Sequence, residues 1–216
     1  MSQVLVFSCD GDPALVTARQ VADRTIARLQ TEGHGVTALL STSANRAHLE
    51  QALPMQEGLA AFSHGREDAL LDGARTPILD SDNIHLLAGK WAWIFACRTA
   101  RDLGGLALAG GARCFAGFEV ALIVDWDEAE IPAQIQSVFW QLVSEVPSLM
   151  ASGCMEEQKI LAALRPLVDE VLDFCMDSPD SPGGLEITAQ QMLRRLVVLG
   201  QSDIECLARA HHEAQV

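Results

Sequence analysis

Short runs of apolar residues alternate with amphipathic stretches along the chain, and this alternation predicts the fold. Five short, mainly apolar runs have the length of buried parallel strands: 4–7, 36–40, 59–62, 91–96 and 112–118. Apolar residues recur at helical spacing over 14–29, 44–53, 103–109, 129–150 and 155–176. Strands that alternate with helices predict an α/β fold of the three-layer sandwich type. We expect a mainly parallel sheet of about five or six strands with helices on both faces.

Two less regular segments complete the predicted organisation. Residues 66–90 are polar and rich in turn-forming residues, and within them 80–83 are typical of a helix start, with apolar residues at 84, 86 and 87 behind it. Residues 178–184 are rich in Ser, Pro and Gly and form the clearest linker, and a last helix is predicted over about 185–210. We therefore expect a domain over 1–178, followed over 179–216 by the linker and a C-terminal helix packed on that domain.

Composition and charge narrow the classes of partner. Hydrophobic residues make up 49% of the 216 residues, which is enough to build a core. The formal net charge of −14 repels phosphate backbones and anionic lipid, so we expect neither nucleic acid nor a membrane surface as a partner. No apolar run approaches the roughly 18–20 residues of a membrane span, and the first residues lack the pattern of a signal peptide. A cytoplasmic location is expected.

The ends of the third and fourth predicted strands carry the residues best suited to catalysis. His64 follows one strand and Cys97 follows the next, 33 residues later, which allows one crossover between parallel neighbours. Ligands bind at the carboxyl ends of such strands. An imidazole can take the proton of a nearby thiol, and the thiolate is a nucleophile. The N–H groups of Gly65 and Cys97 can form an oxyanion hole beside it.

Each of these residues also has a purely structural explanation. His64 can be a turn residue, and Cys97 can be a small buried residue that ends a strand. The six cysteines show neither C-x-x-C pairs nor zinc-finger spacing, so we expect thiols rather than disulfides or a metal site. Cys9 also ends a predicted strand and is the rival candidate for a reactive thiol.

Two sequence signatures resemble those of the caspase-like clan of cysteine peptidases, which includes caspases, metacaspases and gingipains, and in particular its bacterial CHAT branch. One strand ends in Ser63-His64-Gly65, and another ends in Ala96-Cys97-Arg98-Thr99-Ala100. The resemblance implies His64 as general base, Cys97 as nucleophile, and the Gly65 and Cys97 amides as the oxyanion hole. It implies a protein or peptide substrate and neither a metal nor an organic cofactor at the dyad.

Acidic residues near the same edge of the sheet predict which substrates fit. Asp10 and Asp12 follow the first predicted strand, and Asp125 and Asp127 follow the fifth. Carboxylates in a pocket beside the dyad favour an Arg or Lys side chain through charge-assisted hydrogen bonds, so we expect cleavage after a basic residue. The alternative is that these residues only shape turns, cap helices or begin a solvated helix.

Two other functions remain open from the sequence. A caspase-like fold can serve in a protein assembly without turnover, with a regulatory protein as its partner. The sequence Asp10-Gly11-Asp12 after an apolar strand also resembles the magnesium-dependent haloacid dehalogenase phosphatases, in which the first Asp is the nucleophile. Labelling by a thiol-reactive peptide probe separates the first alternative from a peptidase, and magnesium-dependent hydrolysis of a phosphate ester identifies the second.

Overall fold

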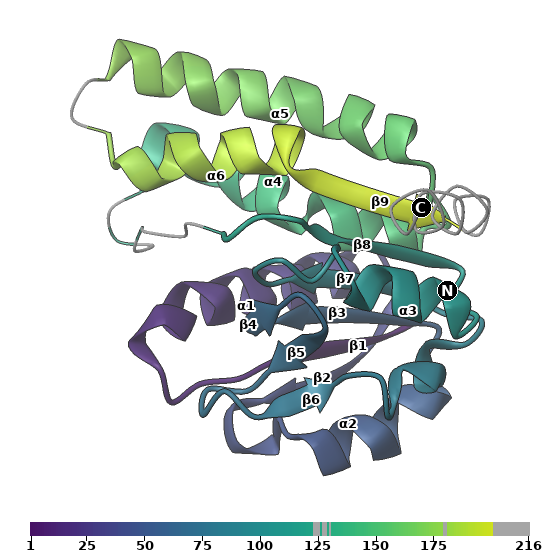
Figure 1. Cartoon of the computed structure of the whole chain (residues 1–216). Helices are drawn as coiled ribbons and strands as arrows, with labels where there is room; N and C mark the ends of the chain where they lie inside the picture. The colour runs from purple at the N-terminus through teal and green to yellow at the C-terminus, as the bar shows by residue number, and fades with distance from the viewer. Residues whose placement is uncertain (123–125, 127–128, 130, 179–180, 201–216) are drawn as a thin grey trace, which may run out of the picture.

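A computed structural model of the chain describes residues 1–122, 126, 129, 131–178 and 181–200, which fold around one six-stranded sheet (Figure 1). Its strands lie in the order β2-β1-β3-β7-β8-β9, and all pairs are parallel except β8 with β9. The strands are β1 (Gln3–Ser8), β2 (Gly35–Leu40), β3 (Gly58–Phe62), β7 (Trp91–Phe95), β8 (Cys114–Phe118) and β9 (Leu196–Gly200). The predicted fold class is confirmed.

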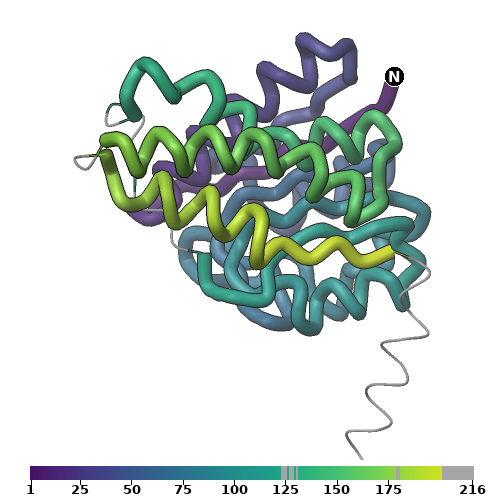
Figure 2. Tube along the Cα trace, turned by 90° about the horizontal axis from the view of Figure 1, so that it is seen from above, coloured from purple at the N-terminus to yellow at the C-terminus, as the bar shows by residue number. Residues whose placement is uncertain are grey.

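Helices cover both faces of this sheet. The chain runs from β1 outward to β2 and then back past β1 to β3, so right-handed crossovers put α1 and α2 on opposite faces. α4 packs on α1, and α5 and α6 pack in turn on α4 and reach β9, as the view from above shows (Figure 2). The helices are α1 (Val16–Thr31), α2 (Arg46–Ala52), α3 (Leu103–Ala109), α4 (Ala133–Ala151), α5 (Glu157–Asp177) and α6 (Gly183–Arg194), with short 3-10 helices η1 (Pro13–Leu15), η2 (Ser41–Ser43), η3 (Leu53–Met55) and η4 (Ile84–Leu87).

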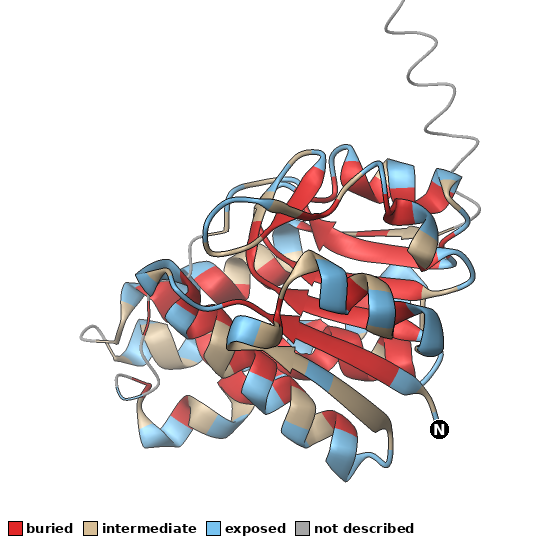
Figure 3. Ribbon diagram, turned by 90° about the horizontal axis from the view of Figure 1, so that it is seen from below, coloured by how far each residue is buried: buried red, intermediate tan, exposed pale blue. Residues whose placement is uncertain are grey.

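The central strands are buried along their whole length. Every residue of β3, β7 and β8 is buried, because helices or loops cover both sides of each strand (Figure 3). Near their carboxyl ends four aromatic rings form a cluster with centroid separations of 5.5–6.0 Å: Phe62, Trp93, Phe95 and Phe118. These rings pack just before the strand ends that carry the candidate chemistry.

The segment over 66–90 is more ordered than the sequence predicted. β4 (His64–Arg66), β5 (Ala69–Leu71) and β6 (Pro77–Leu79) form a second, antiparallel sheet of three strands. Buried side chains at Leu70 and Leu79 attach this small sheet to the core. The sequence did not predict these strands, because three residues are too short to show a period of two. The helix start expected at 80–83 is confirmed, since η4 begins at Ile84.

The C-terminal region also differs from the predicted long helix. α6 ends at Arg194, and β9 follows it, antiparallel to β8. The apolar residues 196–199 pair with the edge that β8 would otherwise expose. They therefore form a strand, although their spacing also fits the helix predicted over 185–210. Residues 201–210 of the predicted helix lie outside the described residues. The division of the chain at residue 178 stays a prediction.

The close packing of Gly58 on Trp91 gives a test of the register between β3 and β7. A Cβ atom at Gly58 would lie 2.0 Å from Trp91 Cε2, and this indole is fully buried. We expect Gly58→Ala to lower the free energy of unfolding by about 1–3 kcal/mol, measured by urea denaturation. Gly105→Ala is the control, since a Cβ on this helical residue meets no atom within 4 Å and should be neutral or stabilising. Equal loss in both variants would contradict the register.

Candidate active site

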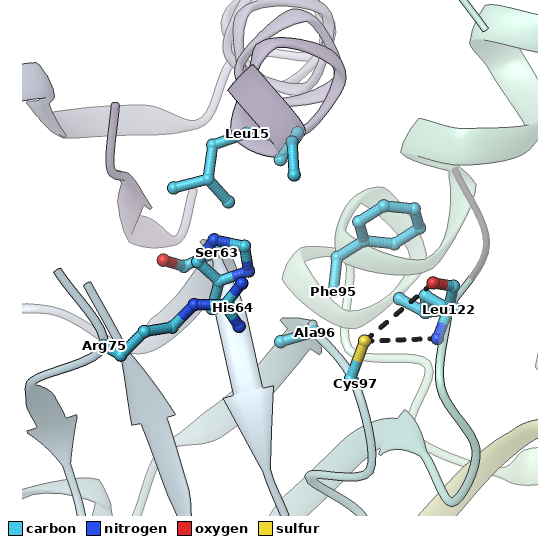
Figure 4. Close-up of a pocket in the computed structure, with 10 residues that line it drawn as sticks. Leu15, Ser63, His64, Arg75, Phe95, Ala96, Cys97 and Leu122 are labelled. Atoms are coloured by element: carbon cyan, nitrogen blue, oxygen red, sulfur yellow. Dashed lines mark hydrogen bonds between the residues drawn. The ribbon is translucent and has the colours of Figure 1, made fainter. Parts of the chain in front are cut away.

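The pairing of β3 with β7 brings His64 and Cys97 to one edge of the sheet. Phe62 lies opposite Phe95 in the ladder, and each candidate residue comes two positions after one of these partners. The predicted parallel neighbourhood of the two strands is therefore confirmed. Both side chains line one pocket of about 240 Å³ (Figure 4).

Four strand ends and one hairpin build this pocket. The four strand ends are those of β1, whose following segment forms η1 and the start of α1, and of β3, β7 and β8. The hairpin contributes the loop between β5 and β6. Apolar side chains make up most of the lining, and the polar exceptions are few. The lining residues are Ala14, Leu15, Ala18, Ser63, His64, Arg75, Phe95, Ala96, Cys97 and Leu122.

Gly65 allows β4 to pass against the turn that carries the thiol. A Cβ atom at Gly65 would lie 2.5 Å from the Cys97 carbonyl oxygen and 2.7 Å from Thr99 Cγ2. The sequence suggested that this glycine admits a substrate backbone, but the close approach seen here is that of the chain's own 97–99 turn. The role of the Gly65 and Cys97 amides as an oxyanion hole stays a prediction.

The His64 imidazole is held by Asp12, which the sequence had assigned to substrate binding. His64 Nε2 lies 2.7 Å from Asp12 Oδ2, and the imidazole side chain is only 10% exposed. The Ala14 N–H, and after it the His64 imidazole, hold the pKa of the Asp12 carboxyl below its usual value. The Asp12 carboxylate therefore fixes the imidazole ring through Nε2. Nδ1 is the ring nitrogen that this contact does not use.

The Cys97 thiol makes its hydrogen bonds on the side of the pocket away from His64. The Leu122 N–H donates to Cys97 Sγ over 3.3 Å, and Sγ lies 3.9 Å from the Leu122 carbonyl oxygen (Figure 4). Among the described contacts none joins the imidazole to the thiol. Catalytic hydrogen bonds are often long in the absence of substrate and shorten when it binds, so this arrangement is compatible with a dyad.

The rival thiol at Cys9 has a different environment. Its side chain is buried and donates to the Ala44 carbonyl oxygen over 3.4 Å. Burial raises the pKa of this thiol, and the nearby Asp72 carboxylate acts in the same direction. Among the described cysteines, Cys97 is the one that lines the pocket. Five cysteines form no disulfide, as predicted, and Cys206 lies outside the described residues.

The remaining predicted carboxylates are not brought into the described part of the pocket. Asp10 is exposed and does not contribute to the lining, and Asp125 and Asp127 lie outside the described residues. Within the described ranges, no group of three or more His, Cys, Asp or Glu residues is placed to hold a metal ion. The preference for a basic residue stays a prediction.

Sequence reasoning missed Arg75, a cationic side chain that lines the pocket. Its guanidinium lies 3.6 Å from Asp12 Oδ2, and its backbone is left-handed with φ of 65°. The Asp72 carboxylate accepts hydrogen bonds from the N–H groups of Ala74 and Thr76 and so shapes the loop that presents Arg75. The sequence Asp72-Gly73 indicated a turn at this loop. Nothing in the sequence indicated that the loop lies over the pocket.

Comparison with known proteins supports the fold and leaves the sequence family open. No protein-family model and no curated protein sequence matches the chain. A secreted C11 cysteine protease from Bacteroides thetaiotaomicron, solved in complex with an irreversible peptide inhibitor, matches with a TM-score of 0.53. The match covers 97% of this chain and 69% of the protease, at 11% identity. The likeness is therefore one of fold.

A flavodoxin from Streptococcus pneumoniae TIGR4 also matches, with a TM-score of 0.32 and 12% identity. This match covers 44% of the chain and spans 61% of the flavodoxin.

Of the helices in the described residues, none combines the length and the apolar character that crossing a membrane requires.

The contact between Asp12 and His64 predicts a pH dependence of stability. A carboxyl whose pKa is lowered by folding stabilises the protein above its ordinary pKa of about 4, and this contribution is lost as pH falls through the lowered value. We expect Asp12→Asn to be less stable than the wild type near pH 7, with a difference that shrinks below pH 4 in urea unfolding. Asp23→Asn, which removes an equal charge from an exposed pair with Arg19, is the control. A difference that is constant with pH would contradict the assignment.

Proposed function

We propose that this protein is a cysteine endopeptidase that hydrolyses peptide bonds with Cys97 as nucleophile and His64 as general base. One observation carries the proposal: His64 and Cys97 line the same pocket at the carboxyl ends of two neighbouring parallel strands. The likeness in fold to a cysteine protease supports it. The substrate is a protein or a peptide, and no metal or organic cofactor takes part in the proposed chemistry.

The chemistry proceeds through a thioester. His64 takes the proton of Cys97 Sγ, and the thiolate attacks the carbonyl carbon of the scissile bond. The Gly65 and Cys97 N–H groups hold the oxyanion, which collapses as the C–N bond breaks and the imidazolium gives its proton to the leaving amine. His64 then takes a proton from water, whose oxygen attacks the thioester. Collapse of that intermediate releases the carboxylic acid and returns the sulfur, which takes its proton back from His64.

Asp12 acts in this proposal through His64 and does not contact the substrate. Its carboxylate lies 2.7 Å from Nε2, so it stabilises the imidazolium that forms when the thiol is deprotonated. Because Nε2 is occupied, Nδ1 is the nitrogen that exchanges protons with the sulfur and the substrate. Asp12 is thus a positioning residue, which the sequence had predicted as a substrate-binding residue.

A catalytically silent module with a regulatory partner is the second candidate. The observation in its favour is that the hydrogen bonds of the thiol go to Leu122 and none joins it to His64 among the described contacts. A magnesium phosphatase that uses Asp10 has no comparable support, since Asp10 does not line the pocket. A cytoplasmic location and a regulatory protein partner stay predictions.

Replacement of the dyad tests the proposed activity. We expect Cys97→Ala and His64→Ala each to reduce peptide hydrolysis by at least about a hundredfold, because each removes a group required for proton transfer or attack. Asp12→Asn should retain part of the activity. Turnover is measured on a mixed peptide library, with thermal unfolding as the check on folding. Cys9→Ala is the matched control and should keep its activity. Turnover that survives Cys97→Ala would exclude the dyad.

The residue preferred before the cut is tested with the same library. A carboxylate paired with a substrate Arg in a partly dry pocket contributes on the order of 1.5–3 kcal/mol, or about a ten- to hundredfold preference. We expect cleavage after Arg or Lys, reduced in Asp125→Ala and unchanged in Asp10→Ala, since Asp10 does not line the pocket. Arg75 is the cation that lines the described pocket. Cleavage after Asp or Glu that is lost in Arg75→Gln would therefore refute the basic preference.

A further inference from the structure

The main chain of Leu122 is the group that contacts the sulfur of Cys97. Its N–H points at Sγ over 3.3 Å, and the residue lines the same pocket as the thiol (Figure 4). Leu122 comes four residues after the end of β8 and is 25 residues away from Cys97 in the sequence. The contact therefore depends on the fold and not on a local turn.

Hydrogen bonds along the preceding residues fix the position of this N–H. Three successive carbonyl groups, at Glu119, Val120 and Ala121, each accept a hydrogen bond. The donors are Arg101 Nε over 2.8 Å, the Arg98 main-chain N–H over 3.0 Å and Gln191 Nε2 over 3.2 Å. Two of these donors come from the turn that carries Cys97 and the third comes from α6. The Leu122 amide is thus held against the thiol from two sides.

A hydrogen-bond donor aimed at sulfur distinguishes the two protonation states of the thiol. A neutral thiol is a weak acceptor, whereas a thiolate is a charged acceptor and binds an N–H much more strongly. The bond therefore strengthens when the proton leaves. We propose that the Leu122 main-chain N–H is a catalytic hydrogen-bond donor that stabilises the Cys97 thiolate. This inference rests on the proposed function for the role of the thiolate.

Loss of the Leu122 N–H should change the reaction rate of Cys97 in opposite directions near pH 7 and near pH 10. Stabilising the thiolate favours the reactive form of Cys97. The same stabilisation makes each thiolate a weaker nucleophile, which cancels part of the gain. Removal of the N–H should therefore slow the reaction of Cys97 near pH 7 and accelerate it near pH 10.

Leu122→Pro and Leu122→Ala form the matched pair for this test. Proline removes the N–H, whereas alanine keeps it and removes only the side chain. Alkylation of Cys97 by iodoacetamide is followed by mass spectrometry of the Cys97 peptide, which separates it from the other cysteines. We expect Leu122→Pro to react roughly three- to tenfold more slowly than wild type at pH 7 and faster at pH 10. Leu122→Ala should stay within about twofold at both.

A second measurement needs no change to the Leu122 backbone. The amide signal of Leu122 in a proton–nitrogen NMR spectrum should shift as the Cys97 thiol loses its proton, because the acceptor becomes charged. In Cys97→Ala this shift should vanish while the amide signals of residues remote from the pocket stay unchanged. An amide signal that titrates equally in wild type and Cys97→Ala would overturn the proposal, as would faster alkylation of Leu122→Pro at pH 7.

Alkylation and NMR require no peptide substrate, so they separate this inference from the proposed function. If the expected alkylation pattern is seen but no peptide is cut, the thiolate donor stands and the peptidase proposal fails. If peptides are cut by Cys97 but its alkylation is unchanged in a folded Leu122→Pro variant, the peptidase proposal stands and the donor assignment fails.

Discussion

The parallel pairing of β3 with β7 is the constraint on which the candidate site depends. The register that places Phe62 opposite Phe95 sets His64 and Cys97 at the same height above the sheet. Rings from three strands pack tightly below this point, so the strand ends cannot slide past each other. Gly65 then lets β4 approach the turn over 97–99 at a distance that any side chain would forbid.

Neighbouring strands on either side supply the partners of the dyad. Asp12 comes from the segment after β1 and bonds to the imidazole, and Leu122 comes from the segment after β8 and bonds to the thiol. Because β1, β3, β7 and β8 are consecutive in the sheet, four adjacent strand ends each contribute one group to the dyad or to its hydrogen bonds. A parallel sheet provides this arrangement without long loops, since its strands all end at the same edge.

The sequence predicted much of the sheet and the edge at which the site lies, because buried parallel strands have a strong apolar signal and their ends are marked by polar turns. It failed for β4 to β6, whose strands are too short to show a period, and for β9, whose apolar run also fits a helix. It could not identify the partner of Asp12, because turn, cap and pocket roles share the same residue type. The Leu122 contact has no sequence signal at all, since a main-chain N–H exists at almost every position.

The central claim is that Cys97 is the nucleophile of a peptide-cleaving site and that His64 activates it. The most direct test is to treat the protein with an irreversible peptide inhibitor that requires a thiolate, and to map the modified residue by mass spectrometry in wild type and His64→Ala. The account predicts a single adduct on Cys97 in the wild type and a strongly reduced adduct in the variant. Modification of Cys9 in place of Cys97, or labelling of Cys97 that is indifferent to His64, would contradict it.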